Sequence, residues 1–194
     1  MVLLCFVYFK GNGMKKMVGH TVKAWMLSAL FFCGVAGTLF SALPAVALPL
    51  APSFTARSLD GRAVASTQLV GKVHIVNFFA SWCPPCRAEI PDMVFLQKKY
   101  GSRGFTFIGV AVDETVSDMR AFITKNQIGY PVVMADDKIV SAFSRYVTGG
   151  LGAIPTSFVV NSSGRITQVI TGARSKEVFE KIIVDALKKP ATPQ

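Results

Sequence analysis

The sequence predicts an α/β fold with a central mixed sheet flanked by helices. Continuous apolar runs at 73–80 and 105–112 are typical of buried strands. Strand-like and helix-like segments alternate from 73 to 146, an order that favours parallel strands covered by helices on both faces. A hairpin and a helix in the last forty residues would add an antiparallel strand to that sheet.

A hairpin opens the predicted domain, because residues 54–66 alternate around the turn dipeptide Asp60-Gly61. The first helix is predicted over 84–100, where Pro91 should interrupt and kink it. The remaining predicted elements are a helix over 117–126, a strand over 130–135, a helix over 138–146, a glycine-rich loop over 148–153, a hairpin of 157–160 with 165–170, and a closing helix over 175–189.

Apolar spacing predicts which residues of the first and last helices face inward. The expected inward sets are Ile90, Met93, Val94, Phe95 or Leu96 and Gln97 in the first helix, and Val178, Phe179, Ile182, Ile183 and Leu187 in the last.

The first 47 residues have the pattern of an export leader. A basic segment at 15–23 precedes an apolar run at 24–40, and no charged residue occurs between 24 and 56. Ala45-Val46-Ala47 then fits the small-x-small cleavage pattern. The sequence therefore predicts a leader over 1–47, a folded domain over 48–194, and a location in the periplasm or another extracytoplasmic space.

An uncleaved membrane anchor is the alternative, because the uncharged block exceeds the roughly 20 residues that a span needs. Its Gly, Ser and Pro content and the Ala-x-Ala site favour cleavage. The translation start stays open between Met1, Met14 and Met17.

The net charge of +10 is spread along the chain, with no basic run longer than pairs such as Lys98-Lys99. Nucleic-acid binding requires a clustered basic surface, so a nucleic-acid partner is not expected.

Outside the leader the only cysteines are Cys83 and Cys86, spaced C-x-x-C. A disulfide over so short a loop constrains little chain entropy, so redox chemistry explains the pair better than stability does. Zinc requires four ligands, and the only histidine outside the leader is His74, in a predicted buried strand. We therefore expect no metal site and no cofactor beyond the cysteine pair.

The motif Cys83-Pro84-Pro85-Cys86 falls where a predicted strand ends and a helix begins. At a helix N-terminus the macrodipole and unpaired N–H groups stabilise a thiolate. Prolines suit the first helical turn, which needs no intrahelical donors. We predict that Cys83 is the exposed nucleophile and that Cys86, one turn later and shielded, resolves the mixed disulfide.

The segment 78–91 (FFASWCPPCRAEIP) resembles the active-site segment of the TlpA/ResA-like thioredoxin family, and 153–160 (AIPTSFVV) resembles that family's cis-proline loop and following strand. The resemblance covers roughly 52–188. It implies a thioredoxin-like fold with an N-terminal β-hairpin and a central strand–helix insertion near 112–137. That family comprises membrane-tethered or exported reductases, several of which serve cytochrome c maturation.

The resemblance also assigns roles to individual residues. Pro155 corresponds to the cis-proline facing the disulfide, which leaves the Ile154 backbone free to pair with an extended substrate. Glu89 corresponds to the family's acid on the active-site helix, a candidate for exchanging a proton with Cys86; a surface charge paired with Arg87 or a lysine is the alternative. Asn77 stands where ordinary thioredoxin has a buried acid.

The substrate-binding set expected around the thiols comprises Trp82, Pro84, Pro85, Ile154 and Pro155. Trp82 would form an apolar shelf beside the nucleophile, unless it simply packs in the core. The loop 149–152 departs from the compact family loop and would shape the substrate rim.

The function these features favour is an extracytoplasmic disulfide reductase. Its substrates would be disulfides of exported proteins, with a cytochrome c apoprotein as the favoured client. Its electron donor would be a membrane or periplasmic dithiol protein. A retained leader would tether the protein to a membrane. A disulfide oxidase or isomerase is the enzymatic alternative. A copper carrier is the non-enzymatic one, although it would require C-x-x-x-C and a distant histidine.

Overall fold

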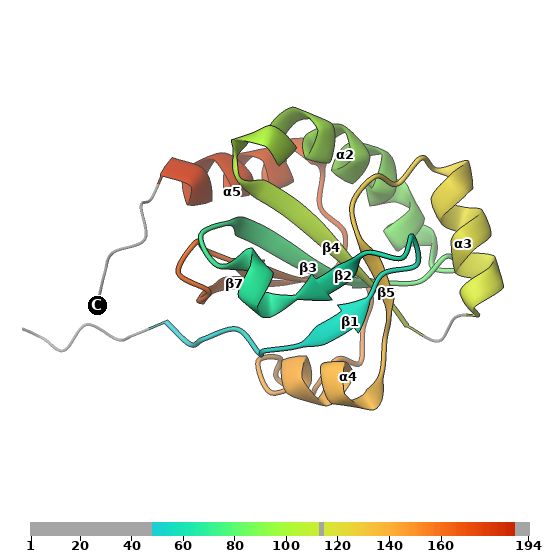
Figure 1. Cartoon of the computed structure of the whole chain (residues 1–194), viewed down its shortest axis with the longest axis horizontal. Coiled ribbons are helices and arrows are strands. Elements are labelled where there is room, and N and C mark those ends of the chain that lie inside the picture. Colours follow the sequence, from blue (N-terminus) through green and yellow to red (C-terminus); the bar gives the residue numbers. More distant parts are fainter. Residues whose placement is uncertain (1–47, 113–114, 189–194) are drawn as a thin grey trace, which may run out of the picture. The chain divides into compact units, whose positions relative to one another are not determined.

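The computed structural model in Figure 1 describes residues 48–112 and 115–188. The predicted leader over 1–47 and the choice of translation start lie outside the described residues. Within the described part of the chain, no helix is both long enough and apolar enough to cross a membrane.

A five-stranded mixed sheet forms the centre of the domain, with the strand order β5-β4-β3-β6-β7. Parallel pairing joins β3 (Val73–Phe79), β4 (Phe105–Ala111) and β5 (Val132–Met134), whereas β6 (Thr156–Val160) and β7 (Ile166–Thr171) run antiparallel to their neighbours. The predicted thioredoxin-like α/β fold is confirmed.

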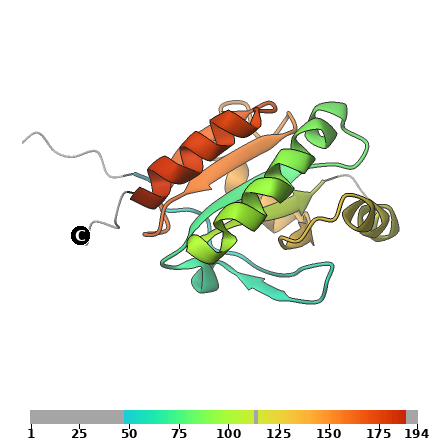
Figure 2. The same ribbon diagram turned by 90° about the horizontal axis from the view of Figure 1, so that it is seen from above.

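Helices cover both faces of this sheet. α2 (Pro84–Tyr100) and α5 (Lys176–Lys188) lie side by side across one face, as Figures 1 and 2 show, and α3 (Val116–Lys125) packs into the same core through Met119. α4 (Asp137–Ser144) covers the other face. The alternation along β3 explains the two cores, because Val73, Ile75 and Phe79 face α2 while Val76 and Phe78 face α4.

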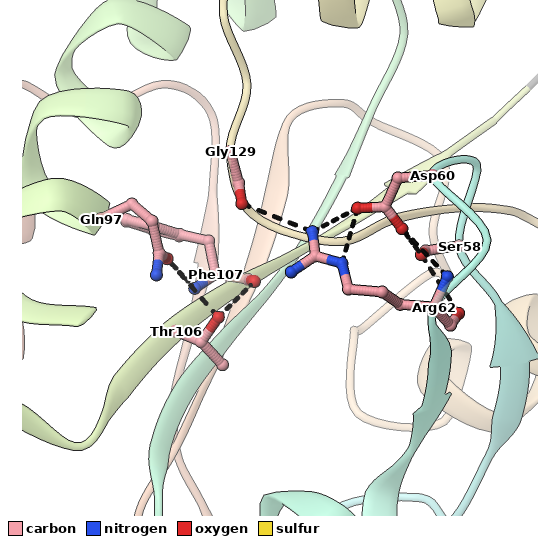
Figure 3. Close-up of polar contacts among 7 residues, drawn as sticks. All are labelled: Ser58, Asp60, Arg62, Gln97, Thr106, Phe107 and Gly129. Atoms are coloured by element: carbon pink, nitrogen blue, oxygen red, sulfur yellow. Dashed lines mark hydrogen bonds and ion pairs between the residues drawn. The ribbon is translucent and has the colours of Figure 1, made fainter. Parts of the chain in front are cut away.

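The predicted N-terminal hairpin is present as β1 (Thr55–Arg57) paired with β2 (Ala63–Ala65), followed by the short helix η1 (Ser66–Leu69). Its tip is bound to β5 and to the segment before it. Leu59 N donates to Val132 O, at the start of β5, at 2.8 Å. Arg62 Nη2 donates to Gly129 O at 3.4 Å (Figure 3). Arg62 also bonds Asp60 and holds the pKa of that carboxyl well below its usual range.

The predicted central insertion is the segment that contains α3 and β5, and β5 extends the sheet at its edge. A further short helix, η2 (Gly101–Arg103), joins α2 to β4. The fold therefore keeps the ends of β3 and β4 adjacent, with α2 starting directly beyond β3.

Two details of the predicted helices are wrong. Val178 is 41% exposed, because the buried stripe of α5 follows its neighbour Phe179. In α2, the open choice between Phe95 and Leu96 is decided for Leu96, since Phe95 is 50% exposed. α2 is also not interrupted at Pro91 and continues to Tyr100.

Candidate active site

The loop between β3 and α2 places the two cysteines at a helix N-terminus. Cys83 is the N-cap of α2, with φ −82° and ψ 112°, and its Sγ accepts a hydrogen bond from Cys86 N at 3.3 Å. Pro84 and Pro85 fill the first turn, where no intrahelical donor is needed. Cys83 and Cys86 are joined by a disulfide, with their Cα atoms 5.3 Å apart.

Both sulfur-bearing residues are buried in this disulfide form. Cys83 is 3% exposed and Cys86 is fully buried. The expectation of an exposed Cys83 is therefore wrong for the oxidised state, because the Ile154 carbonyl oxygen lies over it, 3.8 Å from Sγ. Trp82, in contrast, is 55% exposed, so it does not simply pack in the core.

The loop before β6 lies against the disulfide. The Ile154–Pro155 peptide bond is cis, as the resemblance implied. β6 starts at Thr156, which pairs with Phe78 near the end of β3, so the sheet itself brings Pro155 to the start of α2. Among the described residues, no backbone hydrogen bond uses the Ile154 N–H.

Glu89 lies inside the protein, one turn beyond Cys86 on α2. It is 2% exposed, which rules out the surface charge paired with Arg87. Its Oε1 accepts from Asn77 Nδ2 at 2.9 Å, and its Oε2 accepts from the backbone N of Arg174 at 3.4 Å. Burial raises the pKa of Glu89 to about 7, against the opposing effect of the Asn77 hydrogen bond.

The AhpC/TSA family profile matches residues 49–169, which is more than half of the chain. The chain belongs to the AhpC/TSA family.

Curated relatives of this chain carry the name thiol-disulfide oxidoreductase ResA. The protein of Bacillus thuringiensis is 35% identical over 130 residues, 67% of this chain and 72% of the relative. The protein of Geobacillus thermodenitrificans is 30% identical over 165 residues, 84% of this chain and 91% of the relative. The TlpA/ResA-like resemblance is thereby confirmed.

Solved structures agree with these relatives. A thiol:disulfide interchange protein of the thioredoxin family from Chlorobium tepidum is 48% identical, with a TM-score of 0.72 over 74% of this chain and 99% of that chain. A putative DsbE-type interchange protein from the same organism is 31% identical, with a TM-score of 0.63 over 72% of this chain and 96% of that one. This AhpC/TSA-family chain is a thiol–disulfide oxidoreductase of the ResA/DsbE type.

Sequence reasoning missed several polar groups in the surroundings of Glu89, the oxidoreductase's buried acid. Asn77 Nδ2 donates to Ser157 Oγ at 2.9 Å as well as to Glu89. The Tyr130 hydroxyl is buried and has no hydrogen-bond partner in the described part of the chain. Burial raises the pKa of Tyr130, and the charge of Glu89 raises it further. The sequence offered one signal of this polar cluster, which is the isolated polar residue Asn77 in a mostly apolar strand.

Metal-binding groups are sparse in the described segments 48–112 and 115–188. No cluster of three or more His, Cys, Asp or Glu side chains is positioned there to hold an ion. His74 lies in the opposite face of the sheet, where its Nδ1 contacts Lys72 O at 3.1 Å and burial lowers its pKa.

Proposed function

We propose that this oxidoreductase reduces disulfides of exported client proteins outside the cytoplasm, with the Cys83–Cys86 pair as its redox group. The observation that carries the proposal is the disulfide at the start of α2, set against a backbone N–H of Ile154 that is unpaired within the described residues. An extended client segment pairing with Ile154 would bring its own disulfide to Cys83. Trp82, Pro84 and Pro85 are exposed around that position and would contact the same segment.

The reaction transfers two electrons and two protons to the client. The Cys83 thiolate attacks one client sulfur, the client S–S bond breaks, and the released client thiolate takes a proton. Cys86 then loses its proton, attacks Cys83 Sγ and breaks the mixed disulfide. The second client thiolate takes a proton, and the Cys83–Cys86 disulfide remains. A dithiol protein restores the reduced enzyme by the same exchange in the opposite direction.

Glu89 is the group we assign to the Cys86 proton. It lies three residues after Cys86 on the same side of α2, and both residues are buried away from solvent. A pKa of about 7 suits a general base at neutral pH, because such a group is partly ionised yet still able to bind a proton.

The location and client class rest on sequence features. The apolar block with its Ala-x-Ala site favours export, and exported proteins meet oxidising conditions in which a dedicated reductant is useful. A cytochrome c apoprotein, whose C-x-x-C-H cysteines must be reduced before haem attachment, is the client we favour. The donor would be a membrane or periplasmic dithiol protein.

The reduction potential of the Cys83–Cys86 pair tests the direction of this chemistry. A reductase should equilibrate with glutathione or dithiothreitol buffers at a potential more negative than about −220 mV. A value near the roughly −120 mV of strong oxidants would instead make the protein an oxidase.

Client capture tests the site. In the proposed compartment, Cys86→Ser should accumulate mixed disulfides through Cys83, because the resolving sulfur is missing. Cys83→Ser is the matched control and should capture none. Apocytochrome c among the captured proteins would support the favoured client. If the sample contains apocytochrome c but the captured proteins do not include it, that assignment fails.

A further inference from the structure

Asn77 and Ser157 lie opposite each other on neighbouring strands and are both buried. The antiparallel register of β3 and β6 pairs them directly, so their side chains share the face that packs against α2. Asn77 is fully buried and Ser157 is 2% exposed. The two N–H groups of the Asn77 amide are accounted for by the Glu89 carboxyl and the Ser157 hydroxyl, each at 2.9 Å.

We propose that Asn77, held in place by Ser157, is a positioning residue that tunes the proton affinity of Glu89 for the step in which Cys86 resolves the mixed disulfide. This inference rests on the proposed function, in which Glu89 accepts the Cys86 proton.

A hydrogen-bond donor aimed at a carboxylate stabilises its ionised form, and burial has the opposite effect. Asn77 is the side chain that donates to Glu89 in the described part of the chain, and the other donor is the Arg174 backbone N at the longer distance of 3.4 Å. Burial already has the larger effect on Glu89, and without Asn77 less would oppose it. Glu89 would then hold its own proton at neutral pH instead of accepting the one from Cys86.

The orientation of the Asn77 amide toward Glu89 leaves its oxygen without a hydrogen bond in the described part of the chain. Its Oδ1 is buried and has no hydrogen-bond partner among the described residues. An unpaired buried acceptor is unfavourable. The site nevertheless keeps an amide there, with both donors directed at Glu89 and Ser157.

Other ionisable groups face Glu89 from several elements. Arg174, in the loop before α5, favours the ionised carboxyl, but its guanidinium is tied to the carbonyls of Thr171, Gly172 and Ala173. Tyr130, before β5, stays neutral in the working range because its pKa is raised. Cys83 and Cys86 lie on Glu89's own helix. None of these groups replaces the donor that Asn77 supplies.

The test is the pH dependence of resolution in the Asn77→Leu variant, which keeps the side-chain shape and removes both donors. The reduced protein reacts with dithiobis-nitrobenzoate in two phases: attack by Cys83 releases one coloured thiolate, and resolution by Cys86 releases the second. We expect the midpoint of the second phase to rise by about one pH unit, and its rate below the midpoint to fall about tenfold. Ser157→Ala should shift the midpoint in the same direction by less.

A matched control is Gln97→Met on α2. Gln97 also joins α2 to the sheet through its amide, with Oε1 accepting from Phe107 N at 2.8 Å, but at the end of the helix remote from the cysteines (Figure 3). This variant should leave the midpoint unchanged. In a Glu89→Gln background, Asn77→Leu should add no shift.

The outcomes separate the two proposals. If Glu89→Gln removes the pH dependence and Asn77→Leu leaves the wild-type midpoint in place, the positioning role is overturned and the role of Glu89 stands. If Glu89→Gln itself leaves the profile unchanged, the proton-acceptor role fails. Should Asn77→Leu not fold, the carbon-13 titration of the Glu89 carboxyl in oxidised Ser157→Ala decides: an upward shift supports the proposal, and no shift refutes it.

Discussion

The buried carboxyl of Glu89 should make the stability of the oxidised protein depend on pH. Its pKa is raised from 4.5 to about 7 in the folded state, mainly by burial. Between these two values the folded state binds more protons than the unfolded state, so the free energy of unfolding decreases as the pH rises. Below pH 4.5 both states are protonated and the penalty is absent; above pH 7 it is complete.

The size of this effect follows from the shift. At about 1.4 kcal/mol per pKa unit, a rise from 4.5 to about 7 corresponds to about 3 kcal/mol. Glu89→Gln keeps the shape and removes the titration. The stability of wild type relative to Glu89→Gln should therefore fall by about 3 kcal/mol between pH 4 and pH 8.

Urea unfolding at several pH values, with the disulfide kept intact in both proteins, measures this difference. Burial lowers the pKa of His74, which has the opposite effect on stability, but His74 is present in both proteins and cancels in the comparison. Glu180→Gln on α5 is the matched control. Lys99 lowers the pKa of Glu180, so that difference should be small and opposite in sign. A wild-type to Glu89→Gln difference that is constant across pH would refute the reasoning.

Two further predictions concern the nucleophile and the core. In the reduced protein, an alkylating agent should modify Cys83 first and at lower pH than Cys86, because Cys83 caps α2 and Cys86 is fully buried. Mass spectrometry measures the two labelling rates, and faster labelling of Cys86 would reverse the assignment. Gly109→Ala should lower the free energy of unfolding by about 1–3 kcal/mol, because a Cβ there would lie 2.8 Å from Phe79 Cε1 and 3.1 Å from Val132 Cγ2. An unchanged midpoint of urea unfolding would show that the Phe79 ring moves aside freely.

Local patterns were sufficient to predict the elements that position the site. The apolar run of β3 and the proline-started helix α2 follow from short-range chemistry, and their bounds agree with the sequence to within a residue. The orientation of individual helix residues was harder to predict from the sequence. Phe95 and Leu96 are adjacent and both apolar, and only the packing of α2 on the sheet determines that Leu96 is the buried one.

The partners of Glu89 depend on long-range register. Asn77 and Ser157 are 80 positions apart, and their contact exists because β6 pairs antiparallel to β3 in one specific alignment. A shift of one residue would turn Ser157 to the opposite face of the sheet. No pattern within either strand encodes that alignment, so the sequence alone drew attention to Asn77 without indicating what it binds.

If Glu89 accepts the Cys86 proton as proposed, the presence of Asn77 in place of an acid on β3 moves the proton chemistry from the sheet to α2. A carboxyl at position 77 would belong to the rigid sheet, whereas Glu89 belongs to α2, the same helix as Cys86. Acceptor and thiol are then three residues apart in one continuous element, and their separation depends little on how the client or the cis-proline loop moves. The sheet contributes Asn77, which donates to Glu89, and Ser157, whose hydroxyl accepts from Asn77 and orients its amide. Neither side chain titrates. This division gives Glu89 a fixed geometry from the helix and an adjusted proton affinity from the sheet.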